Sequence, residues 1–122
     1  MPTIIIVDDE EELRENLQDL LEFKGYTVIS YPNGEDMLKQ IDSINSDVFL
    51  LDFQLPGLSG IELIPHIRAK FPDIPIGLVT ASSQPNTIEE AESNGVNRII
   101  FKPYSPMDML QAVEEMLNQE AI

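Results

Sequence analysis

The sequence has no cysteine among its 122 residues, so disulfide bonds and thiolate metal sites are excluded. No apolar run approaches the roughly 20 residues that a membrane-spanning helix needs. Nor does the chain open with the basic and then apolar stretch of a signal peptide. A chain with this composition is expected to act in the cytoplasm, away from the membrane.

Basic residues are scarce as well: 7 Lys and Arg stand against 22 Asp and Glu, for a formal net charge of −15. Such a surface repels phosphate backbones, so direct binding of nucleic acid is not expected. The charge suits a divalent cation or a basic protein surface, although solubility alone accounts for much of it. The single histidine, His66, has no second histidine with which to form a metal or catalytic site.

The length predicts one domain, residues 1–122, in which two kinds of segment alternate. Apolar runs rich in β-branched residues predict buried strands. These runs are continuous rather than alternating in polarity, which favours a parallel sheet covered on both faces. The predicted strands are Thr3–Val7, Tyr26–Ser30, Val48–Leu51, Ile76–Thr80 and Arg98–Phe101.

Each strand is followed by a segment with helical spacing. Glu10, Glu11 and Glu12 are expected to stand at the start of the first helix, where the dipole favours negative charge, rather than to bind a metal. Pro65 is expected to delay or bend the third helix, and residues 84–86 to delay the fourth. The predicted helices are a segment with Leu13, Leu17, Leu20 and Leu21 on one face, Glu35–Ile41, a helix capped by Ser59, Thr87–Ser93 and Pro106–Asn118.

Five such units predict an α/β fold, a doubly wound (βα)5 sheet whose ligands sit outside the carboxyl ends of the strands. Polar side chains stand at four of these five ends. Asp8 and Asp9 follow the first strand, and Asp52 follows the third. Thr80 ends the fourth strand, and Lys102 follows the fifth. Packing alone does not explain this pattern, so we expect a functional site at this edge of the sheet.

Three carboxylates a few ångströms apart repel one another unless a cation lies between them or one is protonated. Mg²⁺ is the most suitable ion, because it prefers a few carboxylates together with water and a phosphate oxygen. A metal, a lysine and a hydroxyl together favour binding of a phosphoryl group. Asp52, at the end of the most apolar strand, is the best candidate to accept that group as an aspartyl-phosphate.

The segments "IIIVDDE", "VFLLDFQLPGLSGIEL", "GLVTAS" and "RIIFKPY" resemble the signature segments of the receiver domain of two-component response regulators. The likeness runs from Thr3 to the last helix. It implies a flavodoxin-like sheet with the strand order 2-1-3-4-5. It also implies that Asp52 is the phosphoacceptor, and that Asp9 binds Mg²⁺ directly and Asp8 largely through water. Asp52 itself and the backbone carbonyl of Gln54 would complete the protein ligands, with Mn²⁺ as a substitute ion.

The same resemblance gives roles to the residues around the acceptor. Lys102 would pair with the phosphoryl oxygens, and the bond to the following proline is typically cis. The hydroxyl of Thr80 and the backbone amide of Ala81 would bind the phosphoryl group. Gln54 and Ser82 stand at positions that tune the lifetime of the aspartyl-phosphate. Ile99 occupies a position that is usually aromatic, so an aromatic switch is expected to be absent or altered.

The resemblance implies phosphotransfer from a sensor histidine kinase or a histidine phosphotransfer protein. The output face would comprise the fourth helix, the fifth strand and the fifth helix, and a homodimer is compatible with it. Glu89, Glu90 and Glu92 make this face acidic. The chain would not be an enzyme beyond self-catalysed phosphotransfer and dephosphorylation. Two alternatives are an aspartyl-phosphate phosphatase that uses Mg²⁺ and a binding module that has lost phosphorylation.

Overall fold

A computed structural model of the chain describes residues 2–120, so Met1 and residues 121–122 of the predicted domain lie outside the described residues. Five parallel strands form one sheet in the order β2-β1-β3-β4-β5, which confirms the predicted fold and strand order. The second strand lies one residue later than predicted, and the third includes Asp52. The strands are β1 (Thr3–Val7), β2 (Thr27–Tyr31), β3 (Val48–Asp52), β4 (Ile76–Thr80) and β5 (Arg98–Phe101).

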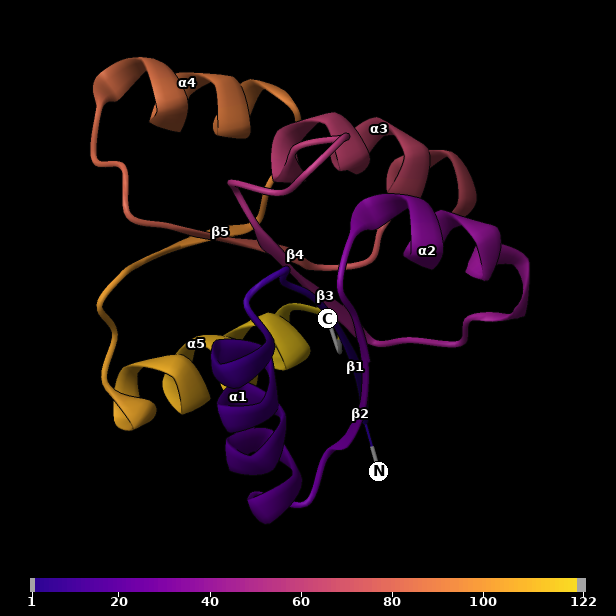
Figure 1. Ribbon diagram of the computed structural model, residues 1–122, viewed down its shortest axis with the longest axis vertical. Coiled ribbons are helices and arrows are strands. Elements are labelled where there is room, and N and C mark those ends of the chain that lie inside the picture. Colours follow the sequence, from indigo (N-terminus) through magenta and orange to yellow (C-terminus); the bar gives the residue numbers. More distant parts are fainter. Residues whose placement is uncertain (1, 121–122) are drawn as a thin grey trace.

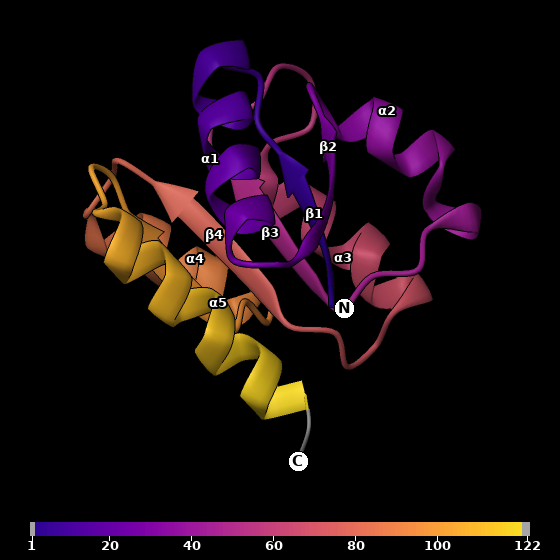
Figure 2. The same cartoon turned by 90° about the horizontal axis from the view of Figure 1, so that it is seen from below.

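Helices cover both faces of the sheet. The helices α1 and α5 lie on one side, and α2, α3 and α4 on the other (Figure 1). A view at right angles separates α1 from α2 and α3 across the strands (Figure 2). The elements are α1 (Glu11–Phe23), α2 (Gly34–Lys39), the 3₁₀ turn η1 (Ile41–Ser43), α3 (Gly60–Lys70), α4 (Pro85–Ser93) and α5 (Pro106–Glu120).

The strands supply alternate residues to two hydrophobic cores. Ile5 and Leu51 belong to the core under α2, α3 and α4, whereas Ile4 and Leu50 belong to the core under α1 and α5. All five residues of β3 are buried, and so are all five of β4. This double burial explains the continuous apolar runs, because each buried aliphatic side chain stabilises the fold by about 1.5–3 kcal/mol.

Several helix boundaries differ from the predictions by one or two residues: α2 begins at Gly34 rather than Glu35, and α5 ends at Glu120 rather than Asn118. The fourth helix begins at Pro85 rather than Thr87, because proline has a suitable φ for the first helical position and lacks an N–H that would be unpaired there. The second helix ends at Lys39, so Ile41 belongs to a separate 3₁₀ turn. Pro65 lies inside α3 and does not delay the start of the helix. The start is fixed by the predicted cap residue Ser59, which forms a capping box with Glu62.

At the amino-terminal end of β4 and β5, Arg68 of α3 joins three segments. Its guanidinium donates to the carbonyl of Ile74, to the carbonyl of Gly95 at 2.9 Å, and to Oδ1 of Asn97 at 2.7 Å. The same Asn97 oxygen accepts the backbone N–H of Ile76 at 2.8 Å. The end of α3, the start of β4 and the turn after α4 are therefore fixed to one another.

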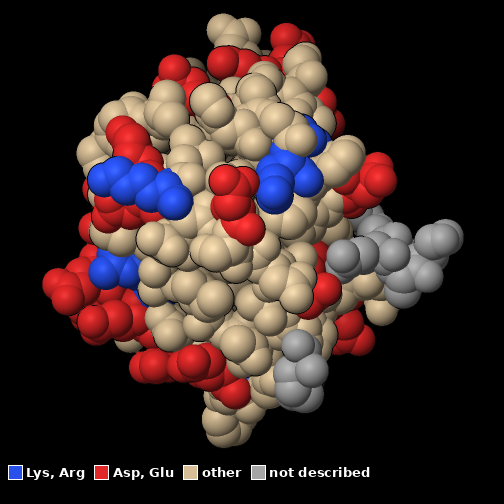
Figure 3. All heavy atoms as spheres, turned by 90° about the vertical axis from the view of Figure 1, so that its right-hand side faces the viewer, with Lys and Arg blue, Asp and Glu red and all other residues tan. Residues whose placement is uncertain are grey.

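The negative charge is distributed over the surface. On the face shown in Figure 3, acidic side chains lie in several separate groups, with uncharged surface between them. This distribution agrees with a charge that serves mainly for solubility. Within residues 2–120, no helix has the length and apolar character needed to cross a membrane.

Candidate acidic phosphoacceptor site

The sheet brings the predicted site residues to one edge. Val7 pairs with Leu51, so Asp8 and Asp52 each stand one residue beyond this pair on neighbouring strands. Thr80 pairs with Phe101 on β4 and β5, and Lys102 comes directly after that pair. The carboxyl ends of four neighbouring strands therefore supply two acids, a hydroxyl and an ammonium.

Asp52 lies at the centre of this edge and is 6% exposed. Its Oδ2 accepts a hydrogen bond from Lys102 Nζ at 3.0 Å. Its Oδ1 accepts one from the backbone N–H of Gln54 at 3.2 Å. Both oxygens of the buried carboxylate are thus held by donors, which offset the free energy of burying a charge.

The backbone behind Asp52 is fixed by the start of α3. The N–H of Gly60 donates to the carbonyl of Phe53 at 3.1 Å. A Cβ atom at position 60 would lie 2.3 Å from the carbonyl oxygen of Asp52. Only glycine therefore allows α3 to begin this close to the candidate acceptor.

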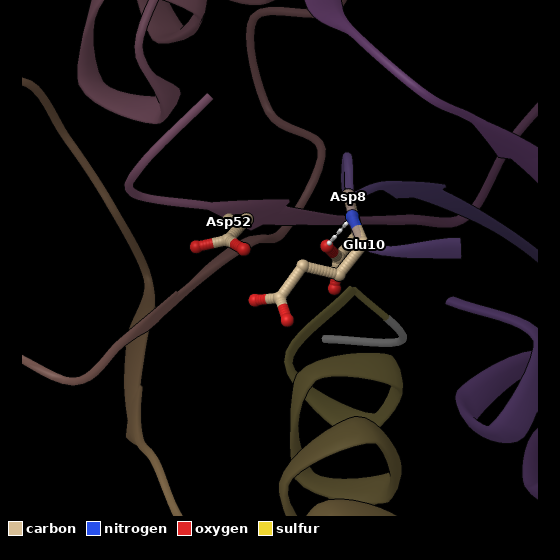
Figure 4. Close-up of side chains that lie close together, drawn as sticks. All are labelled: Asp8, Glu10 and Asp52. Atoms are coloured by element: carbon tan, nitrogen blue, oxygen red, sulfur yellow. Dashed lines mark hydrogen bonds between the residues drawn. The ribbon is translucent and has the colours of Figure 1, made fainter. Parts of the chain in front are cut away.

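Asp8, Glu10 and Asp52 form an acidic group, in which one carboxylate oxygen of each lies within 4.8 Å of the others (Figure 4). Asp8 is 7% exposed, and its Oδ1 accepts the backbone N–H of Glu10 at 2.9 Å. The Glu10 carboxylate also lies 4.0 Å from Lys102 Nζ. Asp9 is exposed and stands outside this acidic group as the structure describes it.

Glu10 stands at the helix start, as expected, but its side chain also joins the acidic group, which was not predicted from the sequence. It precedes the first residue of α1, and its side chain points toward Asp8 and Asp52 (Figure 4). A usable signal was present in the sequence. An aspartate often accepts the N–H two residues further on, which turns the chain back toward the aspartate. Here this turn carries Glu10 over the site.

The electrostatics of the site favour a bound cation. Burial, with a contribution from the charge of Asp52, raises the pKa of Asp8 from 3.8 to about 6. Burial alone would lower the pKa of Lys102, but its hydrogen bond to Asp52 and the neighbouring acids outweigh burial and raise it. Lys102 therefore remains charged near neutral pH. The clustered oxygen donors fit a hard divalent ion, which would relieve their repulsion.

Thr80 is 2% exposed and lies at the start of the loop that leads to α4. Its Oγ1 accepts the backbone N–H of Ser82 at 2.9 Å, and its carbonyl accepts the N–H of Lys102 at 2.8 Å. Ser82 Oγ in turn lies 3.3 Å from Oγ1 of Thr87 in α4. Thr80 thus connects the site to the first turn of α4. Ala81 and Gln54 are exposed beside the acceptor strand ends.

Three residues near Lys102 complete the surroundings. Ile99 is half-buried and packs against the core under α2, α3 and α4. Phe101 is 44% exposed, whereas Tyr104 packs against the core under α1 and α5. The peptide bond between Lys102 and Pro103 is cis.

Residues 4–114 match the response regulator receiver domain family. The transcriptional regulatory protein BaeR of Escherichia coli is 36% identical over 123 residues, which cover 97% of this chain and 49% of BaeR. The CAI-1 autoinducer sensor kinase/phosphatase CqsS of Vibrio cholerae is 34% identical over 82% of this chain and 15% of its own length. The chain thus spans about half or less of these relatives.

A solved structure gives the same result in three dimensions. The response regulator protein TrrA of Thermotoga maritima superposes with a TM-score of 0.86 and is 33% identical, with 96% of this chain and 100% of that chain covered. The match to the family extends over more than half of the chain, and fold and sequence agree. The chain therefore belongs to the response regulator receiver domains, the phosphoaccepting modules of two-component signalling.

Proposed function

We propose that Asp52 accepts a phosphoryl group from a phosphohistidine of a sensor histidine kinase or a histidine phosphotransfer protein. One observation carries this assignment. Asp52 is the buried last residue of the central strand, and its carboxylate lies beside the ammonium of Lys102 and the carboxylates of Asp8 and Glu10. The carboxylate is thus held rigidly beside an ammonium that can pair with an incoming phosphoryl oxygen.

The metal site proposed for this chain uses oxygen donors. Asp8, Asp9, Asp52 and the backbone carbonyl of Gln54 would hold Mg²⁺, or Mn²⁺ in its place. Glu10 adds a further carboxylate to the same acidic group. When bound, the ion would neutralise the charge of the acids and of the phosphoryl oxygens. The TrrA structure was determined in complex with Mg²⁺ and BeF, which supports Mg²⁺ as the ion proposed for this chain.

Different residues of the site have different roles in phosphoryl transfer. An oxygen of Asp52 attacks the phosphorus, and the bond from phosphorus to the histidine nitrogen breaks. Lys102, already 3.0 Å from Asp52, pairs with the new negative charge. Thr80 Oγ1 accepts from Ser82, so its own proton is available to donate to a phosphoryl oxygen, and the Ala81 amide donates alongside it.

Phosphorylation adds about −1.5 to −2 charge, which draws donors toward Asp52. Because Thr80 is connected through Ser82 to Thr87, its displacement would reposition the start of α4. The output face would be the surface formed by α4, β5 and α5, where a downstream protein or domain would bind. A second copy of the chain could bind the same surface and form a homodimer. Ile99 is aliphatic and packed in the core, so no aromatic ring at this position accompanies the change.

Gln54 and Ser82 would set how long the phosphoryl group survives. Gln54 is exposed next to the acceptor, where its side chain can crowd or orient an attacking water. Ser82 is half-buried and fixes the loop between Thr80 and α4. Loss of the group would be self-catalysed, and the chain would not act as an enzyme on other substrates. We place this signalling role in the cytoplasm, without direct contact to nucleic acid or membrane.

Two other functions are less well supported. A phosphatase acting through an aspartyl-phosphate usually has a second acid two residues beyond its nucleophile, where this chain has Gln54. A module that has lost phosphorylation would not need the full set of acids, hydroxyl and ammonium found at this edge. Both alternatives therefore rank below the phosphoacceptor.

The test is phosphorylation by a small donor. The chain is incubated with acetyl phosphate and Mg²⁺, and its intact mass is measured for the wild type and for Asp52→Asn. The expected result is the gain of one phosphoryl group by the wild type and none by the variant. Asp47→Asn, which changes an aspartate at the other end of the sheet, is the matched control and should behave as the wild type. Equal phosphorylation of Asp52→Asn would show that the acceptor is another residue.

A further inference from the structure

A cavity of about 560 Å³ lies between α1 and the segment that joins β5 to α5. Side chains of α1, among them Leu13 and Leu20, line one side, and Pro103, Tyr104 and Pro106 line the other. The walls are mostly apolar. Cavities of about 300–1,000 Å³ with such walls hold small organic molecules.

The cavity opens onto the acceptor site. Asp8, Ala81 and Lys102 line it, and all three belong to the site described above. Lys102 Nζ lies 3.0 Å from Asp52 Oδ2, so the inner end of the cavity is one side chain away from the acceptor carboxylate. A molecule with its apolar body in the cavity would present an anionic head beside Lys102 and Asp52.

We propose that this cavity is a subsite for the leaving group of a small phosphodonor, an acyl phosphate with a branched or aromatic acyl group. The proposal rests on Asp52 being the phosphoacceptor. An oxygen of Asp52 attacks the phosphorus, the bond from phosphorus to the bridging acyl oxygen breaks, and its electron pair leaves with the carboxylate. The leaving carboxylate is a weak base and needs no proton from the protein.

Two features select this class of donor. Lys102 provides the positive charge that an anionic head requires, and the walls provide apolar surface for the acyl body. An acetyl group is too small to contact both walls, whereas a benzoyl group can reach them. A phosphate ester of an apolar alcohol would match the walls equally, but its departing alkoxide would need a proton.

The experiment compares benzoyl phosphate with acetyl phosphate as donors in the presence of Mg²⁺, with the rate of mass gain as the readout. Donor concentrations are kept below saturation, so the rates include binding. Burial of part of a phenyl ring should make the wild type react roughly five-fold faster with benzoyl phosphate. Asn16→Phe, which fills the cavity from an exposed position of α1, should remove this preference and leave the acetyl phosphate rate unchanged.

Glu15→Phe is the matched control, because Glu15 is exposed on α1 outside the cavity lining, and it should keep the preference. Leu13→Ser removes apolar wall without adding bulk and should lower only the benzoyl phosphate rate. Equal rates for the two donors in the wild type would overturn the proposal, as would a preference that survives both Asn16→Phe and Leu13→Ser. Phosphorylation by acetyl phosphate would still support Asp52 as acceptor in these cases. Failure of both donors would instead contradict the phosphoacceptor itself.

Discussion

Replacing Asp8 by asparagine should stabilise the metal-free protein at neutral pH. Asp8 is 7% exposed, and burial raises its pKa from 3.8 to about 6. The folded state thus binds this proton more tightly than the unfolded state. The stabilisation from Asp8 protonation is fully present below pH 3.8 and is lost as the pH rises to about 6. Above that value, the ionised carboxylate destabilises the fold by about 3 kcal/mol at most.

Asparagine keeps the acceptor oxygen for the N–H of Glu10 and removes the charge. We therefore expect Asp8→Asn to raise the free energy of unfolding at pH 7, without metal, by about 1–3 kcal/mol, and to leave it nearly unchanged at pH 4. Mg²⁺ at a hundred times its Kd should stabilise the wild type by about 2.7 kcal/mol, and the variant by much less.

Urea unfolding followed by far-ultraviolet circular dichroism, with and without a chelator, measures these quantities. Asp19→Asn is the matched control, because it removes an exposed charge of α1 from the same highly acidic chain. Its gain should be small at pH 7 and at pH 4. The reasoning would be refuted by an Asp8→Asn protein that is no more stable than Asp19→Asn at pH 7, or by a gain of equal size at both pH values.

Three further predictions concern the same edge of the sheet. Lys102→Met should lower the free energy of unfolding by about 3 kcal/mol, because Asp52 would keep a buried charge without its cation. Urea unfolding measures this loss of stability. A loss no larger than that caused by Lys24→Met, at an exposed position, would contradict the prediction. Gly60→Ala should lower the free energy of unfolding by about 2 kcal/mol or more and slow phosphorylation, because the added Cβ would clash with the Asp52 carbonyl. A variant with unchanged stability and phosphorylation rate would mean that α3 moves aside freely. Asp9→Asn should weaken Mg²⁺ binding about ten-fold by calorimetry, because the proposed ligand set includes Asp9 as a direct ligand, and Glu10→Gln should weaken it by less, because that set does not include Glu10. The reverse order would make Glu10 the principal ligand.

The parallel sheet was predictable because the strands are buried on both faces and so read as continuous apolar runs. The order of strands and helices was then enough to predict Asp8, Asp52, Thr80 and Lys102 at one edge, where the strand pairing places them. Shifts of one or two residues, as at Pro85, reflect turn and cap geometry, which local residue preferences describe poorly.

The position of the Glu10 side chain was not predictable from helix preferences. It depends on the local hydrogen bond from its N–H to Asp8 and also on the Lys102 ammonium, which stands at the end of a separate strand. The cavity beside the site was also missed. It is formed by α1 and the segment after Lys102, which are far apart in the chain, and local periodicity carries no information about space between them.

Because of Arg68, the two ends of α4 are held in different ways. Charged hydrogen bonds to Ile74, Gly95 and Asn97 hold the far end of α4 against its neighbours, whereas its near end is linked to Thr80 by the short chain of contacts through Ser82. A displacement of the first turn of α4 is therefore opposed at the turn that follows the helix. As a result, α4 would tilt about its carboxyl-terminal end rather than shift as a whole.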